Sequence, residues 1–147
     1  MMANKKRVIH AGGVFPNPLL NREGAAAADT KAGVIGFYDE TTAKFTTSVD
    51  GKEANILYVA NFDYLRCQTV DDVIKAGDWV VAIQPMQGLF LNVRAAAGTY
   101  KKGQAVIVAN GQITLATGAE GEAVFAYVEE DTALTVTAGE LVRVVFK

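Results

Sequence analysis

The sequence predicts an all-β protein, a small β-barrel or sandwich with an extended N-terminal arm and at most one short helix. From Gly33 onward, short runs rich in branched and aromatic residues alternate with turn residues, which is the pattern of strands. Three stretches place a glycine and a polar residue before an apolar run: KAGDWVVAI (75–83), KKGQAVIV (101–108) and TAGELVRVV (137–145). A different stretch, AVIVANGQITLA (105–116), contains Asn110-Gly111, which is the turn signal of a hairpin.

The expected strands are short. They are VIGFY (34–38), ILYVANF (56–62), WVVAI (79–83), LFLNV (89–93), AVIV (105–108), QITL (112–115), AVFAYV (123–128) and LVRVVF (141–146). Many short strands with little helix between them favour a barrel or sandwich around one core. Segments 56–62 and 123–128 are apolar on both faces, so we expect each to be central in a sheet or covered by another subunit.

The repeated glycines are interpreted as turn residues at the point where a strand begins. In the first two copies these are Gly77 and Gly103. Glycine adopts positive φ without steric cost, so it suits a sharp entry into a strand. We expect both residues to be structural.

The hairpin at 105–116 has a definite expected register. Asn110-Gly111 fits a two-residue type I′ turn, whose two central residues both need positive φ. That turn places Val108 opposite Ile113 and Val106 opposite Leu115. Gly111 is therefore also a structural turn residue.

A second hairpin is expected where 79–83 turns through residues 85–88 into 89–93. In its first strand, Trp79, Val81 and Ile83 alternate on one face, which places Trp79 in the core or an interface. The single helix candidate in the body is TVDDVIKAG (69–77), where Thr69 is placed to cap one or two turns.

The chain is predicted to divide into an extended arm over residues 1–32 and a β-barrel domain over residues 33–147. Pro16 and Pro18 hold FPNPLL (15–20) in stiff extended geometry. The stretch GAAAADTK (24–31) forms one helical turn or none.

Composition argues against several partners. The formal net charge is −2 and the basic residues are scattered, so neither nucleic acid nor an anionic membrane is an expected partner. Cys67 is the single cysteine, which excludes an internal disulfide and a thiolate-rich zinc site and suits a reducing cytosol. No apolar run reaches the ~20 residues that span a bilayer.

The residues suited to chemistry are few, so we predict no enzyme, no metal and no cofactor. His10 is the one histidine and Ser48 the one serine, and neither has partners at triad or metal-ligand spacing. The acidic clusters at 71–72 and 129–131 are interpreted as solvated residues at strand ends or turns. A chain of this kind is expected to act by binding through its surface.

From residue 56 onward the chain contains an ordered set of segments: TVDDVIKAGDWV, then AAAGTYKKGQAVIVANGQITL, then AVFAYVEE and a closing LVRVVF. This order resembles that of the head decoration, or cement, proteins of tailed bacteriophages. The resemblance covers about Gly33 to Lys147.

The resemblance implies a β-tulip-like barrel without catalytic residues, made in the host cytoplasm and carried on the outer surface of the virion. It implies a homotrimer at three-fold and quasi-three-fold positions, bound to the phage major capsid protein. An N-terminal arm would reach over neighbouring subunits, with Phe15, Pro16, Asn17, Pro18, Leu19 and Leu20 as its interface residues. Gly77, Gly103 and Gly111 would keep their structural role.

Two alternatives stay open. One is a small β-barrel module that binds a carbohydrate or another small ligand, with Trp79 and the tyrosines as a stacking platform. The other is an enzyme accessory domain of cupin-like shape, for which the chain lacks the histidines.

Overall fold

The protein is all-β in the structure, a computed structural model that describes residues 4–13 and 21–147. Two larger sheets and two two-stranded ribbons account for the fifteen strands of the described residues, and every strand pair is antiparallel. Within these ranges neither larger sheet closes on itself, so the architecture is sandwich-like and not a closed barrel.

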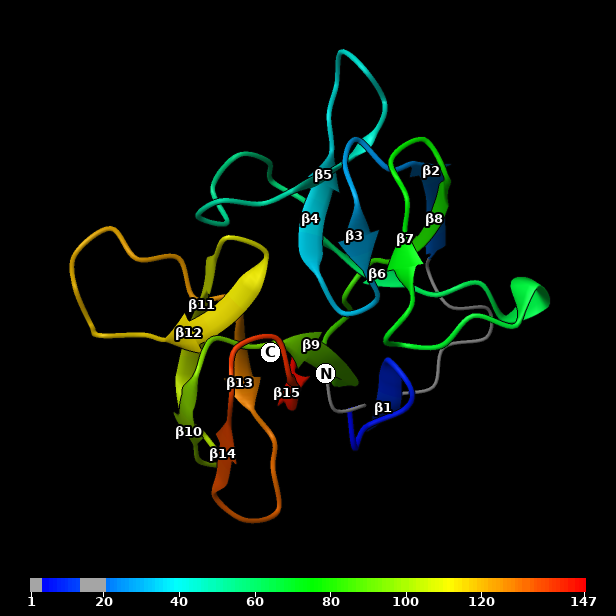
Figure 1. The fold of residues 1–147 in the computed structure, drawn as a ribbon. Coiled ribbons are helices and arrows are strands. Elements are labelled where there is room, and N and C mark those ends of the chain that lie inside the picture. The colour runs from blue at the N-terminus through cyan, green and yellow to red at the C-terminus, as the bar shows by residue number, and fades with distance from the viewer. Residues whose placement is uncertain (1–3, 14–20) are drawn as a thin grey trace.

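Figure 1 shows the larger sheets in different halves of the molecule. The six-stranded sheet has the order β1 (His10–Gly13), β9 (Leu89–Arg94), β15 (Leu141–Val145), β13 (Ala126–Val128), β11 (Ala105–Ala109) and β12 (Gln112–Leu115). The five-stranded sheet has the order β2 (Asn21–Ala25), β8 (Trp79–Ile83), β6 (Tyr58–Asn61), β4 (Ile35–Tyr38) and β5 (Phe45–Thr47). The ribbons pair β10 (Gly98–Tyr100) with β14 (Leu134–Val136), and β3 (Thr30–Lys31) with β7 (Val73–Ile74).

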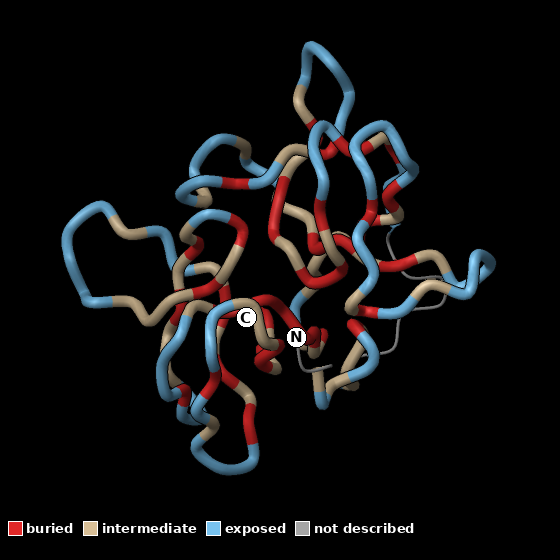
Figure 2. The backbone as a smooth tube through the Cα atoms, viewed as in Figure 1, coloured by how far each residue is buried: buried red, intermediate tan, exposed pale blue. Residues whose placement is uncertain are grey.

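One apolar core joins the two larger sheets. Ile35, Val59 and Ile83 of the five-stranded sheet are fully buried and pack in one cluster with residues of the six-stranded sheet such as Leu91 and Val142. Figure 2 shows this burial along the strands, whereas the connecting loops are exposed. Burying one side chain of this size stabilises the fold by roughly 1.5–3 kcal/mol, so the shared core holds the sheets in one unit.

The three glycine-containing copies form the same turn. In Lys75–Asp78, Lys101–Gln104 and Thr137–Glu140, the first carbonyl accepts a hydrogen bond from the fourth N–H. The third residue is a glycine with φ of 86°, 85° and 89° respectively, which is the geometry of a type II turn. Each turn leads directly into a long strand, β8, β11 or β15.

Each of these turns is also docked in the same way. Each turn exchanges two backbone hydrogen bonds with one buried residue. The glycine N–H donates to the carbonyl of that residue. The N–H of the buried residue donates in return to the carbonyl of the residue that follows the glycine, and all N···O distances are 2.8 to 2.9 Å. The buried partners are Ala26, Val128 and Ala95. The repeated sequence pattern therefore encodes a repeated backbone joint.

The hairpin register predicted for residues 105–116 is confirmed. Val108 pairs with Ile113 and Val106 with Leu115, and φ is 51° at Asn110 and 76° at Gly111. The segments expected to be central are also central where they form strands: β6 lies between β8 and β4, and β13 between β15 and β11.

The second predicted hairpin is wrong. Strands β8 and β9 do not pair; β8 pairs with β2 and β6, and β9 with β1 and β15. The 84–88 connection carries the chain from one larger sheet to the other. Trp79 is 51% exposed, because Val80 and Ala82 occupy the core face of β8.

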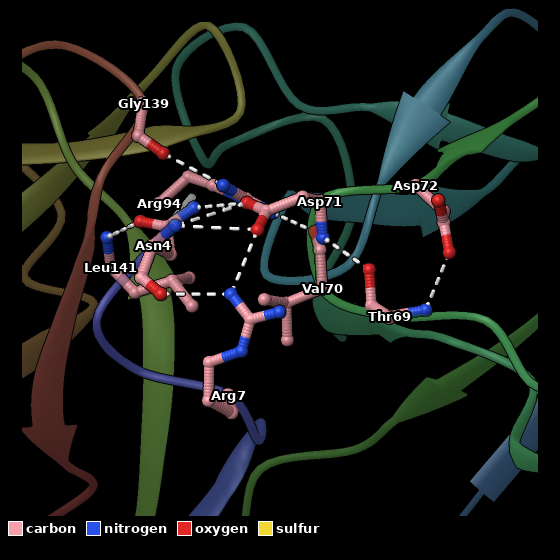
Figure 3. Close-up of polar contacts among 9 residues, drawn as sticks. All are labelled: Asn4, Arg7, Thr69, Val70, Asp71, Asp72, Arg94, Gly139 and Leu141. Carbon is pink, nitrogen blue, oxygen red and sulfur yellow. Dashed lines mark hydrogen bonds and ion pairs between the residues drawn. The ribbon is translucent and has the colours of Figure 1, made fainter. Parts of the chain in front are cut away.

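The helix predicted at residues 69–77 is also absent from the described structure. Thr69 N donates to the Asp72 carboxylate at 2.6 Å, and Asp71 N donates to the Thr69 hydroxyl at 3.3 Å (Figure 3). These bonds close a single turn, after which β7 begins at Val73. The one helix is a 3-10 turn, η1 (Tyr64–Arg66), so no helix in the described part of the chain is long enough to cross a membrane.

Described parts of the predicted arm pair with strands of the body. Strands β1, β2 and β3 pair with β9, β8 and β7, and Ile9 is fully buried. The physical reason is that these short strands cover edges of the body that would otherwise expose unpaired backbone groups. HAGG and NREGA show no apolar alternation, so the pattern gave no sign of them.

Candidate interaction surface

An uncharged groove of about 340 Å³ opens among loops at one side of the sandwich. Its lining consists of Gly51, Ala54, Asn55, Ile56, Leu57, Gln84, Pro85, Val108, Ala123, Val124, Phe125 and Phe146. In a chain with 20% charged residues, none of these twelve carries a charge, and two amides are the only polar side chains. The groove is therefore suited to apolar contacts.

The rim of the groove exposes apolar side chains. Ile56 and Val124 are each 50% exposed, although both are large apolar residues. The rings of Phe125 and Phe146 meet edge to face with centroids 5.2 Å apart. This contact holds the two rings in place in the lining of the groove. Exposed apolar residues around an apolar concavity are typical of a protein interaction site.

The loop beside the groove is held by one carboxylate. Glu53 accepts hydrogen bonds from the Ser48 hydroxyl at 2.8 Å and from Val49 N, and Ser48 is fully buried. Burial alone would raise the pKa of Glu53, but these hydrogen bonds outweigh it and lower the pKa to about 2. The loop is thus ordered by an ionised side chain at neutral pH.

A second exposed apolar feature is the loop around η1, which projects from the body at the right of Figure 1. Leu65 is 95% exposed and Tyr64 is 59% exposed. Asp63 caps the turn by accepting from Leu65 N at 2.9 Å, and Cys67 ends it in the left-handed conformation with φ of 57°. Asp63 and Cys67 limit η1 to a single turn, so Tyr64 and Leu65 lie at the tip of the loop.

A buried arginine links distant segments, as Figure 3 shows. Arg94, 5% exposed, donates from Nε to the Ala32 carbonyl at 2.7 Å, from Nη1 to the Gly139 carbonyl at 2.9 Å, and from Nη2 to the Val70 carbonyl. Burial lowers the pKa of Arg94, whereas the charge of Asp71 opposes that shift. Three chain segments therefore depend on one guanidinium.

The first described residues close over this arginine. The Asp71 carboxylate accepts from Asn4 Nδ2 at 2.7 Å and from Arg7 at 2.9 Å, and Leu141 N donates to Asn4 Oδ1 at 3.3 Å (Figure 3). Burial raises the pKa of Asp71, but these hydrogen bonds and the Arg7 charge hold it below its usual value. We call Asn4, Arg7, Asp71 and Arg94 the arginine seam.

The acidic cluster at residues 129–131 is paired and not simply solvated. Each acid faces its own cation at 2.8 to 3.0 Å: Glu129 with Lys102, Glu130 with Lys6, and Asp131 with Arg143. Within residues 4–13 and 21–147, no group of three or more His, Cys, Asp or Glu lies close enough to hold a metal ion.

The proposed stacking platform does not assemble. The Trp79 indole N–H donates to Glu23 at 3.2 Å on the exposed side of β8, whereas Tyr38 and Tyr100 are buried in separate parts of the fold. Tyr64 contacts Phe62 on the η1 loop. The rings of Tyr38 and Tyr58 meet edge to face with centroids 5.1 Å apart, but Tyr64 and Tyr100 lie elsewhere, so these tyrosines and Trp79 do not form one platform.

The interface residues named from the sequence, Phe15 to Leu20, lie outside the described residues. Sequence reasoning missed the exposed apolar side chains of Ile56, Leu65 and Val124. For Leu65 a signal existed, because FDYLRC places an apolar pair between polar turn residues. For Ile56 and Val124 it did not, since both belong to runs that were expected to be strands.

The chain matches no protein-family model, and no curated protein matches it either.

Proposed function

We propose that this chain is a head decoration, or cement, protein of a tailed bacteriophage. It binds the outside of the assembled capsid as trimers at three-fold and quasi-three-fold positions, where it bridges and stabilises subunits of the major capsid protein. The proposal joins the ordered sequence resemblance over about Gly33 to Lys147 with one structural observation. That observation is the pair of exposed apolar features, the uncharged groove and the η1 tip.

These two features supply the kind of surface that such a role requires. Leu65 and Tyr64 protrude, whereas Ile56 and Val124 surround a concavity, so the chain presents both an apolar anchor and an apolar recess. Buried aliphatic and aromatic anchors carry most of the energy of protein interfaces. Both features lie on loops held by local caps, so little ordering entropy is lost on binding.

The mechanism is mass action on an assembly. A ligand that binds the expanded shell and not its precursor stabilises the expanded shell by its binding free energy. A trimer that has made one contact makes its second and third at high effective concentration, so individually weak apolar patches suffice. The role requires no reactive side chain, only surfaces that are covered on binding.

The test uses heads of the phage that encodes the chain, purified without it, in the expanded and the unexpanded state. We expect the full chain to co-sediment with expanded heads only, and electron microscopy to place it at three-fold positions. Binding to neither form of head would contradict the proposal.

Variants connect the binding to the surface described above. Leu65→Asp and the double variant Ile56→Asp/Val124→Asp place charge on the tip and the groove, and each should lower occupancy at least tenfold. Thr132→Asp adds the same charge at another exposed loop and serves as the matched control. If all variants decorate heads equally, the interface lies elsewhere.

A further inference from the structure

A second concavity, of about 870 Å³, lies along the arginine seam, on a different part of the molecule from the uncharged groove. Its walls come from β3, β7, β12, the tip of the β11–β12 hairpin and the turn at residues 137–140. Concavities of about 300–1,000 Å³ are the usual size of small-ligand sites. We call it the seam cavity.

The charged groups of the seam cavity are balanced, and each of them already interacts with other parts of the chain. Two acids, Asp29 and Glu140, face two bases, Lys31 and Arg94. Asp29 accepts from Ala76 N at 2.9 Å, Glu140 accepts from the 137–140 turn, and Arg94 donates to three carbonyls. The lining therefore has no net charge with which to select an ion.

The uncommitted polar groups of the seam cavity are all neutral. The side-chain amides of Asn110 and Gln112 and the hydroxyls of Thr30 and Thr47 make no hydrogen bond within the described residues. Thr30 is only 7% exposed, and its Oγ1 is buried without a partner. A buried hydroxyl without a partner costs free energy. Because this Oγ1 is itself inaccessible, the groups that a ligand can reach are the amides of Asn110 and Gln112 and the hydroxyl of Thr47.

The chemistry of these groups selects a class of ligand. An amide side chain donates and accepts at once, as a hydroxyl does, so amides and hydroxyls together match a ligand that also carries many hydroxyls. Val34, Val73 and Ala138 add apolar surface for the C–H face of such a ligand. Desolvating a neutral ligand also costs far less than desolvating an ion.

We propose that the seam cavity binds a neutral polyhydroxyl ligand, a mono- or disaccharide unit, through Asn110 and Gln112. This site is separate from Trp79 and the tyrosines, and it does not depend on the proposed capsid role. A chain could bind heads without the sugar, or the sugar without heads, so the two proposals fail independently.

The test is a titration of the full ¹⁵N-labelled chain with glucose, galactose, mannose, N-acetylglucosamine, maltose and lactose at millimolar concentration, followed by NMR. We expect at least one of them to shift the side-chain amide signals of Asn110 and Gln112 in a saturable manner. No shift with any of the six would overturn the proposal, as would saturable shifts confined to Trp79. A preference for inorganic phosphate or sulfate over every sugar would overturn it as well.

Variants make the assignment specific to the cavity. Asn110→Gly keeps the positive φ of the turn and Gln112→Thr keeps a strand-forming residue, so both should fold, which the spectrum checks directly. The double variant should lose roughly tenfold or more in sugar affinity. Gln84→Ala removes an amide from the uncharged groove and should bind as the parent chain does. Equal binding by the double variant and the parent would also refute the assignment.

Discussion

The hairpin tip and the arginine seam each tie distant segments of the chain together, and they do so by different chemistry. At the tip of the β11–β12 hairpin, Gly111 N donates to the Ser48 carbonyl at 2.7 Å, and Ile35 N donates to the Gly111 carbonyl at 2.9 Å. At the seam, one guanidinium reaches carbonyls on three segments. The first joint uses backbone groups alone, and the second uses a single charged side chain.

The two joints therefore depend on different kinds of residue. A backbone joint accepts many side chains, but it demands a glycine where a Cβ would collide with the opposite sheet. A joint made by a buried side chain depends on that residue alone, because three carbonyls lose their donor together if it is removed. Substitutions at the two joints should therefore have separate and unequal effects on stability.

Arg94→Met should be the most damaging change, because the seam then buries three carbonyls without donors. We expect a loss of about 4 kcal/mol in the free energy of unfolding. Urea denaturation measures it, with Lys101→Met, an exposed substitution of the same chemistry, as the control that stays within ~0.5 kcal/mol. A loss below ~1 kcal/mol for Arg94→Met would show that water replaces the guanidinium.

Gly111→Ala should break the hairpin joint. A Cβ at this position would lie 2.6 Å from Thr47 Cγ2 and 2.9 Å from Val34 Cγ1, in a residue with φ of 76°. Strain and overpacking together predict a loss of about 3 kcal/mol in unfolding free energy. Gly103→Ala is matched in φ, at 85°, but meets nothing within 4 Å, so we expect about 1 kcal/mol. Equal losses at the two positions would mean that contact with the opposite sheet contributes nothing.

Asp71→Asn should weaken only the outer part of the seam. It removes the ion pair with Arg7, whose side chain is 51% exposed, and weakens the bonds to Asn4. Solvent screening limits the expected loss to about 1 kcal/mol. Hydrogen exchange should show faster opening of residues 4–9 with little change in β11 and β12. Faster exchange in the hairpin as well would show that the two joints are coupled.

Acid should loosen the loop that supports the hairpin joint, because Glu53 holds Ser48 and Val49. The folded pKa of Glu53, about 2, lies below its ordinary value of 4.5. Its contribution is therefore present above pH 4.5 and is lost as the pH falls toward 2. Because Glu53 is exposed, we expect at most about 1 kcal/mol after screening. Unfolding of Glu53→Gln and of the parent chain should converge at low pH; a constant difference would point to another group.

How far the sequence predicts this fold depends on how local each cause is. The register of the 105–116 hairpin was predictable, because Asn110 and Gly111 alone satisfy the type I′ turn. The pairing of β8 with β9 was predicted from an equally clear pattern and is wrong, because β1 and β15 occupy the edges of β9. Two consecutive strands joined by a turn pair with each other only if no other strand of the fold makes a more stable pair with either of them.

The same distinction applies to the surface. Leu65 sits at a tip because Asp63 and Cys67 bound a single turn, and both signals are local. Ile56 and Val124 belong to strand-like runs, and only the packing of the loops leaves them outside β6 and β13. Alternation along Leu89 to Arg94 gave no sign that Arg94 would be buried.

The all-β class, the three glycine turns and the 105–116 hairpin were predictable from the sequence alone. Each follows from backbone preferences that act over a few residues, such as positive φ at glycine and the branched side chains of strands. The folded structure was needed to show which strands pair, where residues 4–13 and 21–32 pack, and that Arg94 binds three segments. Those outcomes depend on which distant partner buries the most apolar surface and satisfies the most backbone groups, and no short window of residues contains that comparison.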